Sequence, residues 1–317
     1  MQAFQPNPPE IADRTPDDAP GPREIGFDLP RTYNASRLLF DNLSAGRGDQ
    51  IAIQAPEGSF TFGDVCAGAS QFGHGFQALS LHRGDRVLML LDDTAYAIAA
   101  LFGALRCGLV PVLLDPTATA AQIRHAAQDS QALVAVVEGT ALARLDDSVL
   151  AGTRVSALVV VNGEPTGRES VPALAVSPWL GDFPTTLPEA ATDRDEMAFW
   201  LLAPGRNGRP KAIVHLQHDL AYAAACHARN LIGLGTGDLC LSDSPLFTAS
   251  GLCATIAFPF SVGAAAVTRS AEGRFAGLLA SIGRFKPTVV FAPPGAFADI
   301  LVGPTTASGR WPACGPA

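Results

Sequence analysis

The stretch LLAPGRNGRPKAIVH, residues 201–215, holds the residue types best suited to chemistry. Gly205 and Gly208 tolerate positive φ, so the backbone around them can turn its N–H groups into one concavity, and such a nest binds an oxyanion. Lys211 follows with a positive charge. The pattern predicts a phosphate-binding loop between two apolar strands. Taken alone, the same residues also fit an ordinary Gly/Pro hairpin turn braced by the lysine.

This loop differs from other nucleotide-binding motifs. A Walker loop needs Gly-x-x-x-x-Gly-Lys followed by a helix, whereas Pro210 stands five positions after Gly205 and a strand is expected next. The segment GLGTGD, residues 233–238, lacks the last glycine of a dinucleotide fingerprint, and we interpret it as a helix end and turn. Gly-x-Ser-x-Gly does not occur in the sequence, which argues against a hydrolase nucleophile elbow.

Two further groups of polar residues are candidates for a metal site or a ligand site. His215, His218 and Asp219 lie close in sequence, but a metal needs its ligands on one rigid face. The pattern puts His215 at a strand end and His218 at a helix start, so we predict no metal site. Asp92 and Asp93 follow an apolar strand and could face a ligand, but we favour a solvated turn. The six cysteines form no Cys-x-x-Cys pair and are interpreted as reduced thiols.

The elements that position these residues are apolar strands alternating with helices. Such alternation predicts an α/β fold of two layered αβα lobes with largely parallel sheets, in which ligands bind beyond the carboxyl ends of the strands. We expect a disordered tail over residues 1–30, a first lobe over 31–190, a partial second lobe over 191–302 and an irregular tail over 303–317. Strands are expected over 84–91, 109–115, 132–138, 156–161, 197–203, 212–216, 238–243, 264–268 and 288–294, and helices over 94–108, 119–130, 218–232, 251–260, 274–285 and 295–301.

Composition narrows the class of protein. Apolar residues make up 48% of the 317 residues and charged residues 16%, which is typical of a folded chain. The net charge of −8 disfavours a nucleic-acid partner, because phosphate neutralisation needs a basic surface. The uncharged stretch over residues 251–267 contains a proline, and we interpret it as a buried helix, loop and strand rather than a membrane span. With no signal peptide visible, we expect a cytoplasmic protein without a membrane partner.

Longer stretches of the sequence resemble a known protein family. The stretch FWLLAPGRNGRPKAIVHLQHDL resembles the ATP-phosphate loop of the adenylate-forming, or AMP-binding, acyl-CoA synthetase superfamily, and its flanks are most similar to the benzoate–CoA ligase branch. Three further stretches resemble other parts of the same family, and they follow one another in the order found in that family. They are HRGDRVLMLLDDTAYAIAALFGALRCGLVPVLLDP, SPLFTASGLCATIAFPFSVGAAAV and RFKPTVVFAPPGAFADIL. The resemblance covers residues 33–302.

The resemblance implies an acid–thiol ligase that uses ATP, Mg²⁺ and CoA and acts on a small, aromatic carboxylic acid. It implies that an acyl-adenylate and pyrophosphate form first, and that CoA then displaces AMP. Five loop residues correspond to the nucleotide-binding loop of the family, and four residues correspond to the acyl-binding region. These are Gly205, Arg206, Asn207, Gly208 and Lys211 for the nucleotide, and His215, Ala249, Ser250 and Gly251 for the acid.

The loop also departs from the family pattern. Ala203, Pro204, Arg206 and Asn207 stand where the family carries hydroxyl residues, and Ala212 stands in place of a glycine. Losing hydroxyl donors weakens the hold on the β- and γ-phosphates, since a hydrogen bond to a charged group contributes about 1.5–3 kcal/mol. A guanidinium–phosphate contact from Arg206 would offset part of this loss.

The family implies further segments beyond residue 302, including a C-terminal domain with a catalytic lysine. Neither of the two lysines, Lys211 and Lys286, matches that lysine. The last residues, 303–317, resemble no part of the family, as expected of a shifted reading frame or truncated gene, or of an unusual genuine C-terminus. Two functions therefore remain open: a ligase of the aryl-acid type, here incomplete, or a noncatalytic remnant that still binds a nucleotide or an acyl group.

Overall fold

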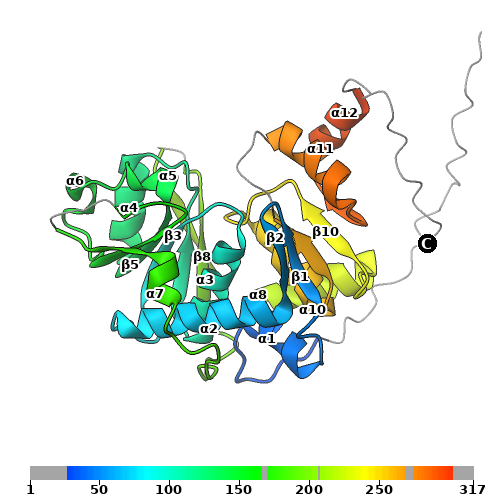
Figure 1. Cartoon of the computed structure of the whole chain (residues 1–317), viewed down its shortest axis with the longest axis horizontal. Coiled ribbons are helices and arrows are strands. Elements are labelled where there is room, and N and C mark those ends of the chain that lie inside the picture. Colours follow the sequence, from blue (N-terminus) through cyan, green and yellow to red (C-terminus); the bar gives the residue numbers. More distant parts are fainter. Residues whose placement is uncertain (1–26, 166–169, 206–207, 269–273, 303–317) are drawn as a thin grey trace, which may run out of the picture.

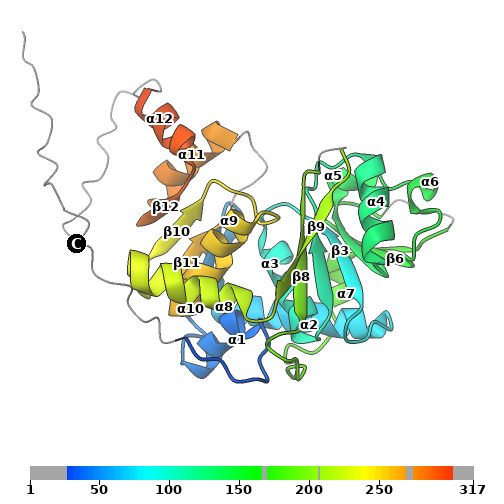
Figure 2. The same cartoon turned by 180° about the vertical axis from the view of Figure 1, so that it is seen from behind.

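The computed structural model describes residues 27–165, 170–205, 208–268 and 274–302. Figure 1 shows two sheets side by side, and the view from behind agrees (Figure 2). The seven-stranded sheet has the order β7-β6-β5-β3-β4-β8-β9 and is parallel except for the β8–β9 pair. Its strands are β3 (Arg86–Leu90), β4 (Val110–Leu113), β5 (Val134–Glu138), β6 (Ala157–Val161), β7 (Ala173–Ala175), β8 (Met197–Ala203) and β9 (Lys211–Leu216).

The five-stranded sheet has the order β12-β10-β11-β1-β2 and is parallel except for the β1–β2 hairpin. Its strands are β1 (Ile51–Ala55), β2 (Gly58–Thr61), β10 (Leu239–Ser242), β11 (Ala265–Val267) and β12 (Val289–Phe291). The α/β class with two largely parallel sheets is therefore confirmed.

Helices cover both sheets. In the first part of the chain they are α1 (Arg37–Ser44), α2 (Phe62–Ala78), α3 (Ala95–Arg106), α4 (Ala120–Ser130), α5 (Gly139–Leu142), α6 (Asp147–Leu150) and α7 (Val176–Leu180). In the second part they are α8 (Asp219–Ala223), η2 (Ala224–Ile232), α9 (Ala249–Leu252), η3 (Cys253–Ala257), α10 (Phe258–Val262), α11 (Arg274–Phe285) and α12 (Pro294–Val302). The segments η2 and η3 are π-helical, so the two long helices expected over 218–232 and 251–260 each contain widened turns.

Local sequence explains where the helices begin. Thr61 caps α2, since its hydroxyl accepts from the amide of Asp64 while the Asp64 carboxylate accepts from the amide of Thr61. Thr119 forms the same reciprocal arrangement with Gln122 at the start of α4. Thr94 caps α3 by accepting from the amide of Ala97. These polar residues fix the ends of helices whose buried faces then pack on the sheets.

The seven-stranded sheet is buried on both faces. Along β3, Val87 and Met89 lie in a core that α2 and α3 share, while Leu88 and Leu90 lie in a second core under α4. This alternation confirms the expectation that wholly apolar strands belong to a sheet covered by helices on both sides. Helices α2 and α3 pack so closely that a Cβ atom at Gly103 would lie 2.5 Å from the carbonyl oxygen of Ala69. The contact therefore requires glycine at this position.

The sheets do not follow the expected division of the chain at residue 190. Strands β8 and β9 extend the first sheet, although residues 191–302 were assigned to the second lobe. Conversely, β1 and β2 belong to the second sheet, because Gln54 of β1 pairs with Val267 of β11. This pairing joins segments far apart in sequence, and local patterning carries no information about it.

Two other expectations need correction. The segment over residues 162–195, for which no helix or strand was expected, contains β7 and α7, whose short length left little periodic signal. Within the expected tail of residues 1–30, the part from Phe27 onward lies against the folded body: the Phe27 ring packs edge-on against Tyr222, and Leu29 accepts a hydrogen bond from Arg194. Residues 1–26 and the tail 303–317 lie outside the described residues. Among the helices that are described, none is long and apolar enough to cross a membrane.

Candidate functional site

The predicted phosphate loop joins β8 to β9 as a hairpin. Ala203 pairs with Lys211 across the antiparallel strands and closes the loop at its base. Two glycines shape it: Gly208 has φ +71°, and a Cβ atom at Gly205 would lie 2.0 Å from the carbonyl oxygen of Arg209. The amide of Gly208 donates to the carbonyl oxygen of Gly205 at 3.2 Å. Both glycines are therefore required by the backbone of this turn. Arg206 and Asn207 lie outside the described residues.

The side chain of Lys211 suits a phosphate. Lys211 is exposed at the first position of β9, and within the described ranges it has no acidic partner. A free ammonium beside a turn with two glycines fits the hold on a phosphate group that the sequence predicts. Pro204 has no N–H to offer, so one of the backbone donors of such a loop is missing.

His215 lies on the same hairpin, further along β9. Its ring stacks on Phe199 of β8 with centroids 4.7 Å apart, and its Nδ1 atom lies 3.0 Å from a carboxylate oxygen of Asp219. The nearby ring of His218 lies 3.3 Å from the other carboxylate oxygen of Asp219. Asp219 thus holds both histidines in place. Where the chain is described, no group of three or more His, Cys, Asp or Glu side chains is arranged to hold a metal ion.

Ala249, Ser250 and Gly251 form the first turn of α9, beside the five-stranded sheet. Ala249 and Ser250 are exposed, and Gly251 is buried. The hydroxyl of Thr248 accepts from the amide of Gly251 at 3.1 Å and caps the helix. A Cβ atom at Gly251 would lie 1.9 Å from the carbonyl oxygen of Pro245, so this glycine allows the preceding loop to approach the helix. The structure thus places these residues on a helix, separate from the hairpin that carries Lys211 and His215.

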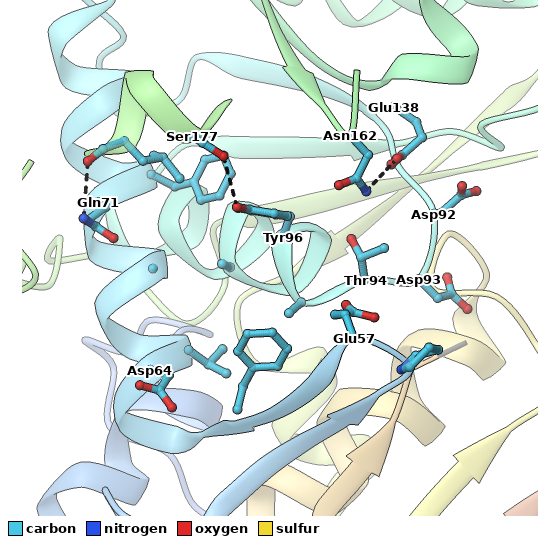
Figure 3. A pocket seen from close by; sticks show the side chains of 18 of the residues that line it. Glu57, Asp64, Gln71, Asp92, Asp93, Thr94, Tyr96, Glu138, Asn162 and Ser177 are labelled. Atoms are coloured by element: carbon cyan, nitrogen blue, oxygen red, sulfur yellow. Dashed lines mark hydrogen bonds between the residues drawn. The ribbon is translucent and has the colours of Figure 1, made fainter. Parts of the chain in front are cut away.

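A well-formed cavity in the described part of the chain lies elsewhere. Its volume is about 760 Å³, and it opens between the two sheets on the side of α2, α3 and α7 (Figure 3). None of the seven predicted site residues that the structure describes lines it. The lining includes five acidic side chains, four other polar ones and three aromatic rings. These are Glu57, Asp64, Asp92, Asp93 and Glu138; Gln71, Thr94, Asn162 and Ser177; and Phe60, Phe72 and Tyr96.

Asp92 and Glu138 are the most constrained acids of this cavity. Asp92 follows the end of β3 and is half-buried; burial raises the pKa of its carboxyl, and the nearby charge of Asp115 raises it further. Glu138 ends β5 and is 4% exposed. Burial raises the pKa of Glu138 as well, while the hydrogen bond that its Oε1 atom accepts from Asn162, at 2.8 Å, opposes the rise.

Asp92 and Asp93, for which a solvated turn was favoured, line this cavity and so could face a ligand, the alternative that the sequence left open. Both side chains are half-buried in the wall of the cavity, and Asp93 accepts a hydrogen bond from the amide of Leu246 at 2.8 Å. Glu138 and Asn162 are not among the predicted site residues. One signal was available: Asp92 and Glu138 each stand at the carboxyl end of an apolar strand, where ligands of parallel sheets bind.

The comparisons with known proteins agree on one family. The AMP-binding enzyme family model matches residues 40–310. Among curated proteins, the benzoate–CoA ligase of Thauera aromatica is 31% identical over 278 residues, covering 87% of this chain and 51% of that protein. The 4-hydroxybenzoate–CoA/benzoate–CoA ligase of Rhodopseudomonas palustris is 28% identical over 275 residues, covering 86% of this chain and 50% of that protein.

Solved structures agree in fold. The anthranilate CoA ligase AuaEII in complex with anthranoyl-AMP aligns with a TM-score of 0.80 at 28% identity, covering 86% of this chain and 51% of that one. A benzoate CoA ligase from Burkholderia xenovorans aligns with a TM-score of 0.76 at 27% identity, covering 86% of this chain and 53% of that one. The chain therefore spans about half the length of the relatives it matches.

Proposed function

Because the chain belongs to the AMP-binding enzyme family, whose model matches most of its length, we propose that it serves as part of an AMP-forming acid–CoA ligase of the aryl-acid type. The observation that carries the proposal is the similarity, across almost the whole described chain, to ligases named for benzoate, hydroxybenzoate and anthranilate. The proposed substrate is accordingly a small aromatic carboxylic acid.

The proposed reaction has two steps. A carboxylate oxygen of the acid attacks the α-phosphorus of ATP, the bond to the β-phosphate breaks, and an acyl-adenylate and pyrophosphate form. The thiolate of CoA then attacks the acyl carbon and releases AMP. Mg²⁺ would neutralise phosphate charge during the first step.

We assign the phosphates of ATP to the hairpin loop. Gly205 and Gly208 give the turn its shape, and the exposed ammonium of Lys211 stands at its base, free of an acidic partner in the described ranges. Arg206 and Asn207 complete the loop in sequence, and the guanidinium of Arg206 would replace part of the hold that hydroxyl side chains give elsewhere in the family. We assign the acid to the region of His215 and the first turn of α9, Ala249 to Gly251.

A second candidate function is nucleotide or acyl binding without ligation. It is favoured by the composition of the loop. Neither Ala203 nor Pro204 carries a hydroxyl, and Pro204 also lacks an amide donor. A loop that holds the β- and γ-phosphates weakly would bind ATP without aligning pyrophosphate as a leaving group.

ATP–pyrophosphate exchange separates the two functions. We expect the purified chain to exchange label when benzoate is added with ATP and Mg²⁺, and we expect Lys211→Gln to lower the rate at least about tenfold, because it removes a charge-assisted contact. Lys286→Gln is the matched control, since Lys286 is the other lysine of the chain and is exposed at the end of α11. Its exchange rate should be unchanged.

The outcomes are distinct. ATP binding by calorimetry without any exchange would support the binding module and contradict the ligase. Equal loss in both lysine variants would contradict the assignment of Lys211. Arg206→Ala should weaken ATP binding, and an unchanged dissociation constant would exclude the compensating role of Arg206.

A further inference from the structure

The imidazole ring of His215 is held on two sides. One face of the ring stacks on Phe199, with centroids 4.7 Å apart and planes 10° apart. Phe199 is 1% exposed and belongs to the core of the first sheet, so this side of the ring rests on a closely packed surface. The Nδ1 atom of His215 lies 3.0 Å from the Oδ2 atom of Asp219. Stacking fixes the plane of the ring, and the carboxylate fixes its rotation within that plane.

The carboxylate of Asp219 is itself fixed. Its Oδ2 atom also accepts a hydrogen bond from the backbone amide of Leu216 at 3.2 Å, and its Oδ1 atom lies 3.3 Å from Nε2 of His218. The Nδ1 atom of His218 in turn lies 2.9 Å from the carbonyl oxygen of Arg194. These contacts leave the side chain of Asp219 little freedom to turn away from His215.

The contact with Asp219 decides which nitrogen of His215 carries the proton. A carboxylate only accepts hydrogen bonds, so Nδ1 of His215 must be the donor. In a neutral imidazole the other nitrogen is then a bare acceptor. Among the residues that the structure describes, Nε2 of His215 has no hydrogen-bond partner, and the side chain is 24% exposed. Its lone pair is therefore available to a bound molecule.

A bare acceptor at this place distinguishes among aromatic acids. The proposed function puts the acid in the region of His215 and the first turn of α9, and the selectivity described here rests on that function. A carboxylate carries only acceptors, so it cannot pair with a bare Nε2 atom. A hydroxyl or amino group on the aromatic ring can donate to it, whereas an unsubstituted ring leaves the nitrogen unpaired.

We propose that Asp219 is a positioning residue for the acid site. By holding His215 as the tautomer protonated at Nδ1, it presents Nε2 as an acceptor that selects aromatic acids with a hydroxyl or amino donor on the ring. Asp219 does not touch the acid in this arrangement and acts through His215 alone.

The tautomer can be measured without a substrate. In the 317-residue chain with isotope-labelled histidine, a long-range proton–nitrogen correlation spectrum at neutral pH distinguishes a protonated ring nitrogen from a bare one. His215→Gln identifies the signals of His215 by their loss. We expect a protonated Nδ1 and a bare Nε2. The opposite tautomer, an average of the two, or protons on both nitrogens would overturn the proposal.

Two aspartate variants test the cause. Asp219→Ala should release the ring of His215 and give a mixture of both tautomers. Asp195→Ala is the matched control, because the Asp195 carboxylate lies 3.3 Å from Nδ1 of His218 and does not contact His215. The signals of His215 should be unchanged in this control. Signals that are also unchanged in Asp219→Ala would show that Asp219 does not set the tautomer.

Selectivity is measured with acids of equal charge. Hydroxy- and aminobenzoates are compared by calorimetry with methylbenzoates substituted at the same ring position. At one position, we expect the donor to improve binding about fivefold to tenfold over the methyl group, because it gains a hydrogen bond. Asp219→Ala should reduce this ratio to about one, while Asp195→Ala should keep it.

The outcomes separate this proposal from the proposed function. A ratio near one at every ring position of the unaltered chain would overturn the selectivity, although the acids still bind. Failure of every acid to bind would contradict the proposed function and the selectivity together. The histidine spectrum needs no acid, so the expected tautomer would even then uphold the positioning of His215 by Asp219.

Discussion

The two sheets are built from similar apolar strands but are covered to different extents. Every residue of β5 and of β6 is buried, whereas each residue of β12, at the edge of the second sheet, is only half-buried. The small core under the second sheet has three buried members, Leu241, Val267 and Leu278, while Leu279 and Phe297 nearby are each 39% exposed. Coverage, rather than strand hydrophobicity, distinguishes the central strands of the first sheet from this edge of the second, and we expect the less covered part to open first.

The largest expected effect tests this difference with two phenylalanines. Phe102 on α3 is fully buried and stacks on Phe260 of α10 with centroids 6.1 Å apart, so it joins the cores of the two sheets. Phe102→Ala should lower the free energy of unfolding by about 3–5 kcal/mol. Phe297→Ala on α12 should cost about 1 kcal/mol or less, because that ring is already partly in water. Urea denaturation measures both, and equal costs would break the comparison.

A pair of glycines gives effects of opposite sign. At Gly103 of α3, a Cβ atom would lie 2.5 Å from the carbonyl oxygen of Ala69, so Gly103→Ala must push α2 and α3 apart and should destabilise by about 1–3 kcal/mol. At Gly283 of α11, nothing lies within 4 Å of the added Cβ. Gly283→Ala should therefore stabilise by about 0.5–1 kcal/mol, since alanine favours the helix. Thermal melts of the two variants check the signs, and destabilisation by Gly283→Ala would show that α11 is packed more tightly than described.

Two acids of the cavity wall should give opposite pH signatures. The pKa of Glu138 is raised by burial, so the folded chain holds this proton more tightly than the unfolded chain. Its carboxyl therefore favours folding at pH values below its ordinary pKa, and this contribution is lost as the pH rises through the raised pKa. The gain in stability from Glu138→Gln should thus be larger at pH 7 than at pH 4.

Asp64 is the counterpart within the same cavity. The hydrogen bond from the backbone amide of Thr61 lowers the pKa of its carboxyl, and so does the hydroxyl of Thr61. Asp64 therefore contributes stability above its ordinary pKa and loses it as the pH falls through the lowered pKa. Asp64→Asn should cost stability at pH 7 and less at pH 3. A parallel pH dependence for the two variants would contradict the assigned burial of Glu138.

The smallest effect concerns two buried thiols, one on helix α2 and one in strand β10. Burial raises the pKa of Cys66 on α2 and of Cys240 on β10 to about 12 in each case, so both are protonated and unreactive at pH 8. Because their pKa values match, a difference in labelling rate reports local opening. With the other cysteines replaced by serine, we expect Cys240 to react with a disulfide reagent before Cys66. Faster labelling of Cys66 would reverse the order of stability of the two sheets.

Much of the fold could be predicted from the sequence. The strand over 197–203 and the helix over 274–285 were predicted at their observed bounds, because apolar runs and helical spacing are local signals. The Gly/Pro hairpin between β8 and β9 was also foreseen from its glycines. Sheet membership could not be predicted, since β1 finds its partner β11 more than two hundred residues later.

The cavity was missed for the same reason. Asp92 and Glu138 stand 46 positions apart and meet only because β3 and β5 are neighbours in the sheet. Nothing near either residue marks it, apart from the apolar strand that it follows. The hairpin between β8 and β9, in contrast, is contained in a single short segment, so its turn could be predicted from spacing, while its role as a phosphate loop stays a prediction. Whether Arg206, Asn207 and the acyl-region residues act as proposed is decided by the exchange and binding experiments.

The pairing of β1 with β11 has a consequence for synthesis on the ribosome. Gln54 leaves the exit tunnel long before Val267, its partner in the sheet, has been made. At about 5–20 residues per second, the nascent β1–β2 hairpin waits roughly ten to forty seconds for that partner. During this interval its apolar face is available to chaperones, and slow codons between the two segments would prolong the exposure.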